Sequence, residues 1–278
     1  MPGFDLHTHS TLSDGTTTIE QNVADAVALG LDGLGVTDHD TTAGFEQALA
    51  AADGTALEIV PGTEFSAELD GWSVHVLGYW VAPDDGPLVA ELARLRDERT
   101  ERARRIVSRF NELGIDITFE RVAKIAGAAP IGRPHIAQAV VESGAVTSAR
   151  EVFDRYLADG GPANVEKHAV HPVRAVELLV AAGGVAVLAH PGLYGARDGV
   201  GGIDDVVIDE LAAAGLAGIE ADHPDHDETQ CQHYRQLAAG LGLVVTAGSD
   251  YHGEAKTNLL GSATTDREQV EALRSRRT

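Results

Sequence analysis

The sequence predicts an α/β fold, a β/α barrel interrupted by a small, mainly helical insert. Short apolar strands alternate with helical segments over most of the 278 residues, a pattern typical of parallel strands with helices packed outside them. Polar side chains follow several of these strands, at the edge where such barrels carry their active sites. Charge also divides the chain, because residues 88–167 contain 13 Lys and Arg against 12 Asp and Glu, whereas the remainder contains 8 against 31. We therefore expect residues 88–167 to form a separate domain within an acidic barrel.

The first motif follows a short apolar run at the start of the chain. His7 and His9 are two residues apart, so an extended backbone places both imidazoles on the same side. Imidazoles in this arrangement suit a cation such as zinc, manganese or iron. Asp14 lies five residues further on, in a turn where Gly15 tolerates a positive φ and lets the carboxylate return toward the histidines.

A helix is expected directly after this motif. Thr17 is followed three residues later by a glutamate, which is the spacing of a capping box and predicts Thr17 as the N-cap. Ile19, Val23 and Val27 recur at helical spacing and predict the buried face. Gly30 is expected to end the helix.

Polar residues also follow the strands expected further along the barrel. These strands are residues 34–37, 57–60, 72–79, 185–189, 218–221 and 243–247, with helices at 43–52, 172–182 and 204–214 and another before the last strand. The polar residues at or near the strand ends are His39, Glu64, His190, His223, Asp250 and His252. His75 lies on the strand 72–79, which is expected to follow a hairpin through Asp70 and Gly71. A single Asp or His at such a place can simply cap the next helix, but so many at corresponding ends favour a shared site.

The segment 88–167 follows a linker at residues 82–87. Apolar residues at helical spacing predict a buried stripe, and seven arginines lie between Arg94 and Arg109. Most of these arginines are interpreted as a solvated helix face. The sequence Gly132-Arg133-Pro134-His135 differs, because it places Arg, Pro and His together at the start of a helix and favours binding of an anion.

Composition excludes several classes of protein. The net charge of −22 argues against a binding surface for extended duplex nucleic acid, whose phosphates need Lys and Arg. The one cysteine, Cys231, excludes an intramolecular disulfide, so metals would be held by imidazole and carboxylate. No apolar run approaches the ~18 residues of a membrane helix and no signal peptide is evident, so no membrane partner and a cytoplasmic location are expected.

Together these motifs resemble the PHP (polymerase and histidinol phosphatase) family. The resemblance implies a distorted seven-stranded β/α barrel, formed by residues 1–87 and 168–278, with the insert 88–167 covering the active site. It also implies two or three divalent metal ions, namely manganese, iron or zinc. One metal would be held by His7, His9 and Asp250, a second by His75 and His190, and a third by Asp14, His39 and His252, with Glu64 bridging the first two. All nine positions are filled.

The insert and the last strands are similar to the branch of this family that acts on nucleotides. The resemblance implies a phosphatase for 3′,5′-nucleoside bisphosphates or for the 5′ end of short single-stranded oligonucleotides. A hydroxide between two metals would attack phosphorus. Arg133, His135 and Lys167 would bind the substrate, His223 would protonate the leaving oxygen or contact its phosphate, and Asp250 would act in catalysis as well as on the metal.

Three other functions are compatible with the same residues. Hydrolysis of a C–N bond could use the same hydroxide, as in amidohydrolase relatives, and a histidinol-phosphate-like substrate is a second alternative. A non-catalytic metal-binding accessory module is the third. The full ligand set disfavours the accessory module, and Arg133 in the near-neutral insert disfavours an amide substrate.

Overall fold

The computed structural model describes residues 3–127, 131–158, 160–165, 170–194 and 202–277. The chain divides into two compact units, Met1–Leu92 with Ala169–Thr278, and Ala93–His168. The boundary falls within a long helix, α3, which spans Gly86–Glu112, so the expected linker already contains the first residues of this helix.

Seven strands form the framework of the first unit, in the order in which they occur in the chain. They are β1 (Phe4–Asp5), β2 (Gly33–Val36), β3 (Glu58–Leu69), β4 (Trp72–Tyr79), β5 (Val185–Leu188), β6 (Leu216–Asp222) and β7 (Val244–Ala247). All neighbouring pairs are parallel except β3–β4 and β4–β5, because β4 runs in the opposite direction. The segment after β1 meets the segment after β7 through a parallel bridge between Thr8 and Tyr251. The result is a nearly closed, distorted seven-stranded α/β barrel, as predicted.

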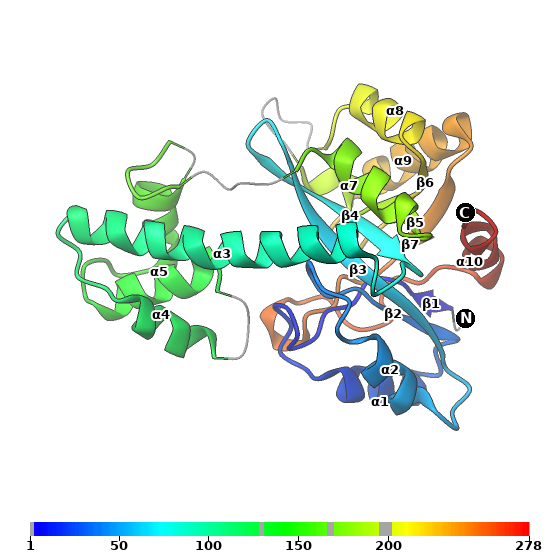
Figure 1. Ribbon diagram of the computed structural model, residues 1–278, viewed down its shortest axis with the longest axis horizontal. Coiled ribbons are helices and arrows are strands. Elements are labelled where there is room, and N and C mark those ends of the chain that lie inside the picture. Colours follow the sequence, from blue (N-terminus) through cyan, green and yellow to red (C-terminus); the bar gives the residue numbers. More distant parts are fainter. Residues whose placement is uncertain (1–2, 128–130, 159, 166–169, 195–201, 278) are drawn as a thin grey trace. The chain divides into compact units, whose positions relative to one another are not determined.

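Helices pack around this sheet (Figure 1). They are α1 (Ile19–Leu29), α2 (Phe45–Ala52), α7 (Pro172–Ala181), α8 (Asp205–Ala213), α9 (Glu228–Leu241) and α10 (Arg267–Arg274), with short 3-10 turns η2 (Pro191–Leu193) and η3 (Gly253–Ala255). Helices α1 and α2 pack on each other beside β2 and β3, while α7, α8 and α9 lie against the strands from β4 to β7. Within the part of the chain that the structure describes, no helix is long and apolar enough to cross a membrane.

The barrel core consists of apolar residues from strands and helices that meet on both faces of the sheet. One cluster joins Phe4, Leu6, Leu77 and Val187 with Leu273 of α10. A second cluster joins α1 and α2 to β2 and β3. Burial of this apolar surface is the main force that holds the strand ends in place.

The second unit is helical and has its own core. Beyond α3 it contains α4 (Phe119–Ala126), α5 (Arg133–Glu142), α6 (Ala149–Val152) and a short π-helix, η1 (Phe153–Leu157). Ile106 and Phe110 of α3 are fully buried in a cluster with residues of α4 and α5. The predicted stripe is confirmed, because Leu88, Leu92 and Leu95 are buried as well.

Two local expectations were wrong. The N-cap of α1 is Thr18, whose hydroxyl accepts the Gln21 amide, so the helix begins one residue later than the capping-box pattern predicted. Val27 is 41% exposed and Ala26 is buried instead. At 3.6 residues per turn, position 26 lies about 20° from Ile19 around the helix, whereas position 27 lies about 80° away.

The third strand also differs from the expectation. It was expected to end at residue 60, but β3 continues to Leu69. Its first residues pair with β2 and its later residues pair with β4. Glu64 therefore lies inside a strand, yet a bridge to His39 keeps it at the level where β2 has ended.

Candidate metal centre

The nine residues that the PHP resemblance implied as metal ligands lie together at one edge of the barrel. Eight of them fall into three overlapping groups whose ligand atoms lie within 4.8 Å of one another. The groups are His7, His9, Glu64 and Asp250; His9, Asp14, His39 and His252; and His39, Glu64 and His75. The ninth, His190, places Nε2 3.1 Å from Glu64 Oε1. The antiparallel direction of β4 explains why His75, which lies in the first half of its strand, joins residues that follow other strands.

Glu64 lies at the centre and turns one carboxylate oxygen to each side. Oε2 is 3.2 Å from His7 Nε2 and 3.0 Å from His9 Nε2. Oε1 is 2.8 Å from His75 Nδ1 and 3.1 Å from His190 Nε2. The residue is 1% exposed. A carboxylate that serves two sets of imidazoles in this way is suited to link two cations.

Asp14 organises the third group, which is the most open of the three. Its Oδ1 is 3.2 Å from His252 Nε2, and its Oδ2 is 3.6 Å from His39 Nε2. The Asp14 side chain is 36% exposed, whereas His252 is buried. His9 Nδ1 also approaches Asp14 Oδ1, at 3.5 Å, so His9 faces both this group and Glu64.

These atoms fit divalent cations better than they fit one another. Among the described residues, several buried nitrogen and oxygen atoms at the centre have no hydrogen-bond partner, and a buried polar atom without one costs about 1–3 kcal/mol. They are His7 Nε2, His9 Nε2, Asp14 Oδ1, His39 Nδ1, Glu64 Oε2 and His75 Nδ1. Imidazole nitrogens and carboxylate oxygens are the donor set of zinc, manganese and iron sites, so cations would satisfy all of these atoms.

Outer contacts turn the imidazole nitrogens toward the centre. Glu220 accepts from His7 Nδ1 at 3.0 Å and also receives the His190 backbone amide at 2.9 Å. Because the Nδ1 proton of His7 points to a carboxylate, Nε2 presents its lone pair inward. Gly248 permits this approach, since a Cβ there would lie 2.4 Å from His7 Cβ and 2.5 Å from Glu220 Oε1.

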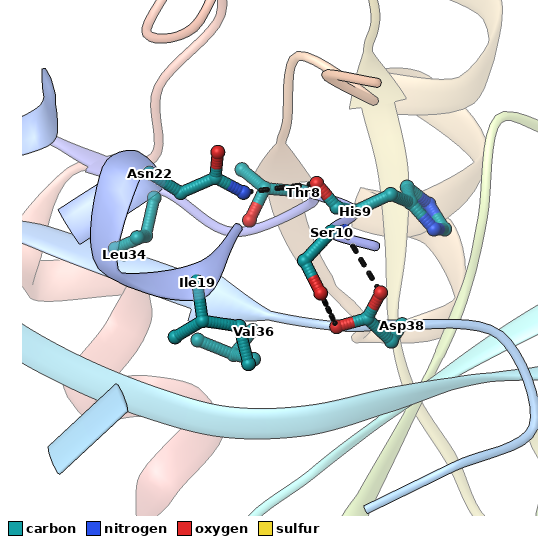
Figure 2. A pocket seen from close by; sticks show the side chains of 8 residues that line it. All are labelled: Thr8, His9, Ser10, Ile19, Asn22, Leu34, Val36 and Asp38. Atoms are coloured by element: carbon teal, nitrogen blue, oxygen red, sulfur yellow. Dashed lines mark hydrogen bonds between the residues drawn. The ribbon is translucent and has the colours of Figure 1, made fainter. Parts of the chain in front are cut away.

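Figure 2 shows the corresponding contacts behind His9. Asn22 of α1 donates to the His9 carbonyl at 2.9 Å, and Asp38 accepts from the Ser10 amide and hydroxyl, both at 2.8 Å. The Ser13 hydroxyl donates to Asp38 at 2.6 Å and lies 3.3 Å from His9 Nδ1. Ser13 therefore accepts the Nδ1 proton of His9 and leaves Nε2 to face Glu64.

Tyr194 joins the two strands that carry the second pair of imidazoles. Its hydroxyl accepts the His75 amide and donates to the Ala189 carbonyl, both at 2.9 Å. Its ring centroid is 5.4 Å from that of His190. His190 itself has φ of 27°, and Asp250 has φ of 51°. Positive φ at residues other than glycine is strained and is retained where the surroundings enforce it, which is common at functional sites.

The charges at the centre favour ionised carboxylates and affect the imidazoles in two opposite directions. Burial by itself raises the pKa of Glu64, but His39, His75 and His7 outweigh it and hold the pKa well below its usual range. Burial lowers the pKa of His39 well below 6.5, and it also lowers the pKa of His190. For His7 and His9 the nearby carboxylates outweigh burial and raise the pKa, to well above 6.5 for His7 and to about 9 for His9. Neutral imidazole and ionised carboxylate are the forms that bind metals.

His223, the candidate acid, lies beside the centre and is fully buried. Its Nδ1 accepts the Asp225 amide at 3.1 Å, so the proton of the neutral ring is carried on Nε2. Nε2 is 3.6 Å from Asp250 Oδ2. The proton of His223 thus faces the carboxylate that also approaches His7 and His9.

The expected substrate residues belong to the second unit. Arg133 is the first residue of α5, and its guanidinium has no ion-pair or hydrogen-bond partner within the described ranges. His135 Nδ1 accepts the Gly132 amide at 3.0 Å and so caps the same helix. Lys167 lies outside the described residues.

Sequence reasoning missed three residues at the centre, namely Glu220, Tyr194 and Lys256. A glutamate within the apolar strand β6 was the available signal for Glu220, since a buried carboxylate needs a partner. Lys256 was detectable only as the one lysine outside residues 88–167. No sequence signal marked Tyr194.

Comparison with known proteins identifies the family. The PHP domain family matches residues 5–124. A 3′,5′-nucleoside bisphosphate phosphatase from Chromobacterium violaceum is 35% identical over 253 residues, which cover 91% of this chain and 88% of that protein. The chain belongs to the PHP family. The resemblance read from its metal-ligand motifs is thus confirmed, and the chain is a metal-dependent phosphoric ester hydrolase.

Other members are similar over comparable lengths. A phosphoribosyl 1,2-cyclic phosphate 1,2-diphosphodiesterase from Eggerthella lenta is 33% identical over 90% of this chain and 94% of its own. The 5′-3′ exoribonuclease Rnm of Escherichia coli is 32% identical over 90% and 85%. A crystal structure of a protein from Bifidobacterium adolescentis, described as a metal-dependent phosphoesterase, superposes with a TM-score of 0.86 at 33% identity and covers 100% of this PHP chain and 97% of that chain.

Proposed function

We propose that this PHP enzyme hydrolyses phosphate monoesters of nucleotides, either 3′,5′-nucleoside bisphosphates or the 5′ end of short oligonucleotides. The observation that carries the proposal is the position of Glu64, whose two oxygens face two separate sets of imidazoles. Two cations a few ångströms apart are suited to phosphoryl transfer. The nucleotide is inferred from the relative that is 35% identical and is named for a nucleoside bisphosphate.

The metals are assigned to the groups described above. His7, His9 and Asp250 would hold one cation, and His75 and His190 a second, with Glu64 between them. Asp14, His39 and His252 would hold a third. Cations bound there would supply an activated water and would offset negative charge on the phosphoryl group. Manganese, iron and zinc all accept this donor set.

His223 is proposed to give its proton to the leaving oxygen. The Asp225 amide occupies Nδ1, so the ring has one exchangeable proton when neutral and it points toward Asp250. Protonation of a leaving alkoxide by a positioned imidazole contributes about 10²–10⁴-fold to such reactions. Asp250 Oδ2 lies 3.6 Å from this nitrogen, and Asp250 would hold a metal through its other oxygen.

The residues from the second unit are proposed to bind the rest of the substrate. The guanidinium of Arg133 has two edges that match phosphate geometry, and it lies where the amides of α5 also favour an anion. His135, whose Nδ1 caps the same helix, and Lys167 are proposed as further substrate-binding residues.

A substrate panel tests this function. Manganese-loaded protein is assayed with a 3′,5′-bisphosphonucleoside, 5′-phosphorylated short RNA, histidinol phosphate, a phosphoribosyl 1,2-cyclic phosphate and a small amide. We expect the first two to react with the highest kcat/KM, with release of inorganic phosphate or of 5′ mononucleotides. Preferential cleavage of the amide, the cyclic phosphate or histidinol phosphate would refute the nucleotide assignment.

A further inference from the structure

The Lys256 ammonium contacts the oxygen of Asp250 that is not directed at His7 and His9. Asp250 Oδ1 is 3.3 Å from His9 Nε2 and 3.6 Å from His7 Nε2. The other oxygen, Oδ2, contacts Lys256 Nζ. The two oxygens of this carboxylate are therefore divided between the metal group and the lysine.

The same oxygen brings Lys256 close to the candidate acid. His223 Nε2 is 3.6 Å from Asp250 Oδ2, the atom that the ammonium contacts. The His223 side chain is completely buried, whereas the Lys256 side chain is 41% exposed. Lys256 thus reaches the centre from the solvent side, along which a substrate can approach.

The backbone on both sides of Lys256 is held in place. Before it, the Glu254 amide donates to Thr16 Oγ1 at 2.8 Å. After it, the Asn258 amide group donates to the Ser249 carbonyl at 3.0 Å and to Asp225 Oδ2 at 3.2 Å. Because Asp225 also holds His223, the loop that carries Lys256 and the ring of His223 are positioned by one set of contacts.

The ammonium retains donors for another group. An ammonium has three N–H donors, and Asp250 is its one hydrogen-bond partner among the described residues. The Asp250 side chain is 2% exposed and the Lys256 side chain 41%, so the ammonium keeps a solvent-facing side on which a further acceptor can bind. The carboxylates of Asp14, Glu64 and Asp250 offset part of the charge of the proposed cations, so an ammonium at this place would add positive charge for a phosphoryl group.

We propose that Lys256 is a substrate-binding residue of this site, whose ammonium donates to a non-bridging oxygen of the phosphoryl group while it retains Asp250. The proposal rests on the phosphoesterase function above and adds a contact that the metal-ligand motifs do not include. The ammonium would act as a point charge. Lys256 lies in the loop after β7, in the same unit as the candidate metal ligands.

The test compares Lys256→Met with Lys124→Met, which removes the same charge from an exposed position at the end of α4. Inorganic phosphate is titrated into both manganese-loaded variants and the wild type by calorimetry, and the metal content of each is measured. We expect phosphate to bind Lys256→Met about 10–100-fold more weakly, the range for a charge-assisted hydrogen bond. Metal content and melting temperature should stay at the wild-type values, and Lys256→Arg should recover part of the affinity.

Two results would overturn the proposal. One is equal phosphate affinity in Lys256→Met and Lys124→Met, and the other is loss of metal from Lys256→Met, which would assign the lysine to the metal group instead. The proposed function is tested separately, because a wild-type protein that cleaves no nucleotide ester fails that function even if phosphate binding depends on Lys256.

Discussion

At the scale of single residues, Glu64 and Glu220 are both fully buried glutamates, but they have different partners. Glu64 contacts imidazole nitrogens that have no other hydrogen-bond partner among the described residues. Glu220 instead receives a ring nitrogen of His7 and the backbone amide of His190. One carboxylate is therefore suited to bind metal directly, and the other to orient residues that do.

Glu64→Gln should remove metal and activity together. The amide keeps the volume of the side chain but loses the negative charge and one acceptor oxygen, so it cannot serve both sets of imidazoles. We expect the bound metal per chain to fall and the phosphatase rate to drop by orders of magnitude, with far-UV circular dichroism unchanged. Wild-type activity with unchanged metal stoichiometry would remove Glu64 from the mechanism.

Glu220→Gln should weaken metal binding without abolishing it. Loss of such an orienting contact to a metal-binding histidine typically costs about 10–100-fold in metal affinity or activity. The manganese dissociation constant measures the effect, and Glu210→Gln on the exposed face of α8 provides the matched control. If both variants bind manganese equally well, the contact to His7 has no positioning role.

At the scale of elements, the long strand β3 joins opposite ends of the chain. Its first residue, Glu58, pairs with Arg274 and Arg267 of α10, and Arg267 Nη1 lies 3.0 Å from Glu58 Oε2. Further along the same strand, Glu64 lies at the centre of the site. The C-terminal helix thus anchors the strand that carries the central carboxylate.

Glu58→Gln should lower stability in a pH-dependent manner. Burial raises the pKa of Glu58, but Arg274 and Arg267 outweigh this and lower the pKa below 4.5. A lowered carboxyl pKa contributes stability above the unfolded value, and the contribution is lost as the pH falls through the folded value. We expect a loss of about 0.5–1 kcal/mol in the free energy of unfolding at pH 7, measured by urea denaturation. The difference between variant and wild type should shrink toward pH 3, and a difference that grows on acidification would contradict the assignment.

At the scale of the whole molecule, most of the Lys and Arg residues, 13 of 21, lie in the segment 88–167. The chain has a net charge of −22, yet residues 88–167 are close to neutral. In the proposed function the acidic barrel binds the cations, and arginine of the second unit binds the nucleotide.

Arg133→Ala should impair the nucleotide reaction selectively. A charge-assisted contact to phosphate contributes about 2–3 kcal/mol, which corresponds to ~30–150-fold in kcat/KM. A small aryl phosphate that does not reach the second unit should react as before, and Arg133→Lys should restore part of the loss because an ammonium lacks the planar fork. Arg150→Ala, at a 91% exposed position of the same unit, is the control. Equal damage to both substrates would instead indicate a role at the metals or misfolding.

The sequence by itself determined the kind of fold and the identity of the candidate ligands. Strand–helix alternation predicted the barrel, since the apolar periodicity of each segment can be recognised without knowledge of how the strands pair. His7, His9 and the other candidate ligands were recognisable because a metal needs particular donor atoms, and few residue types provide them. The candidate ligands occur along the chain in the order of the family motifs, and the structure brings them together at one edge of the barrel.

Only the tertiary structure decided how these residues meet. The hairpin predicted at Asp70 and Gly71 accounts for the reversed direction of β4, which brings His75 to the edge where the other strands end. The extension of β3, which brings Glu64 there, does not follow from a local pattern. Glu220 meets His7 across 213 positions of sequence, and Lys256 acquires its place from a loop held by Thr16. A side chain that acts through a distant partner leaves no local signal in the sequence, because its environment is created by packing.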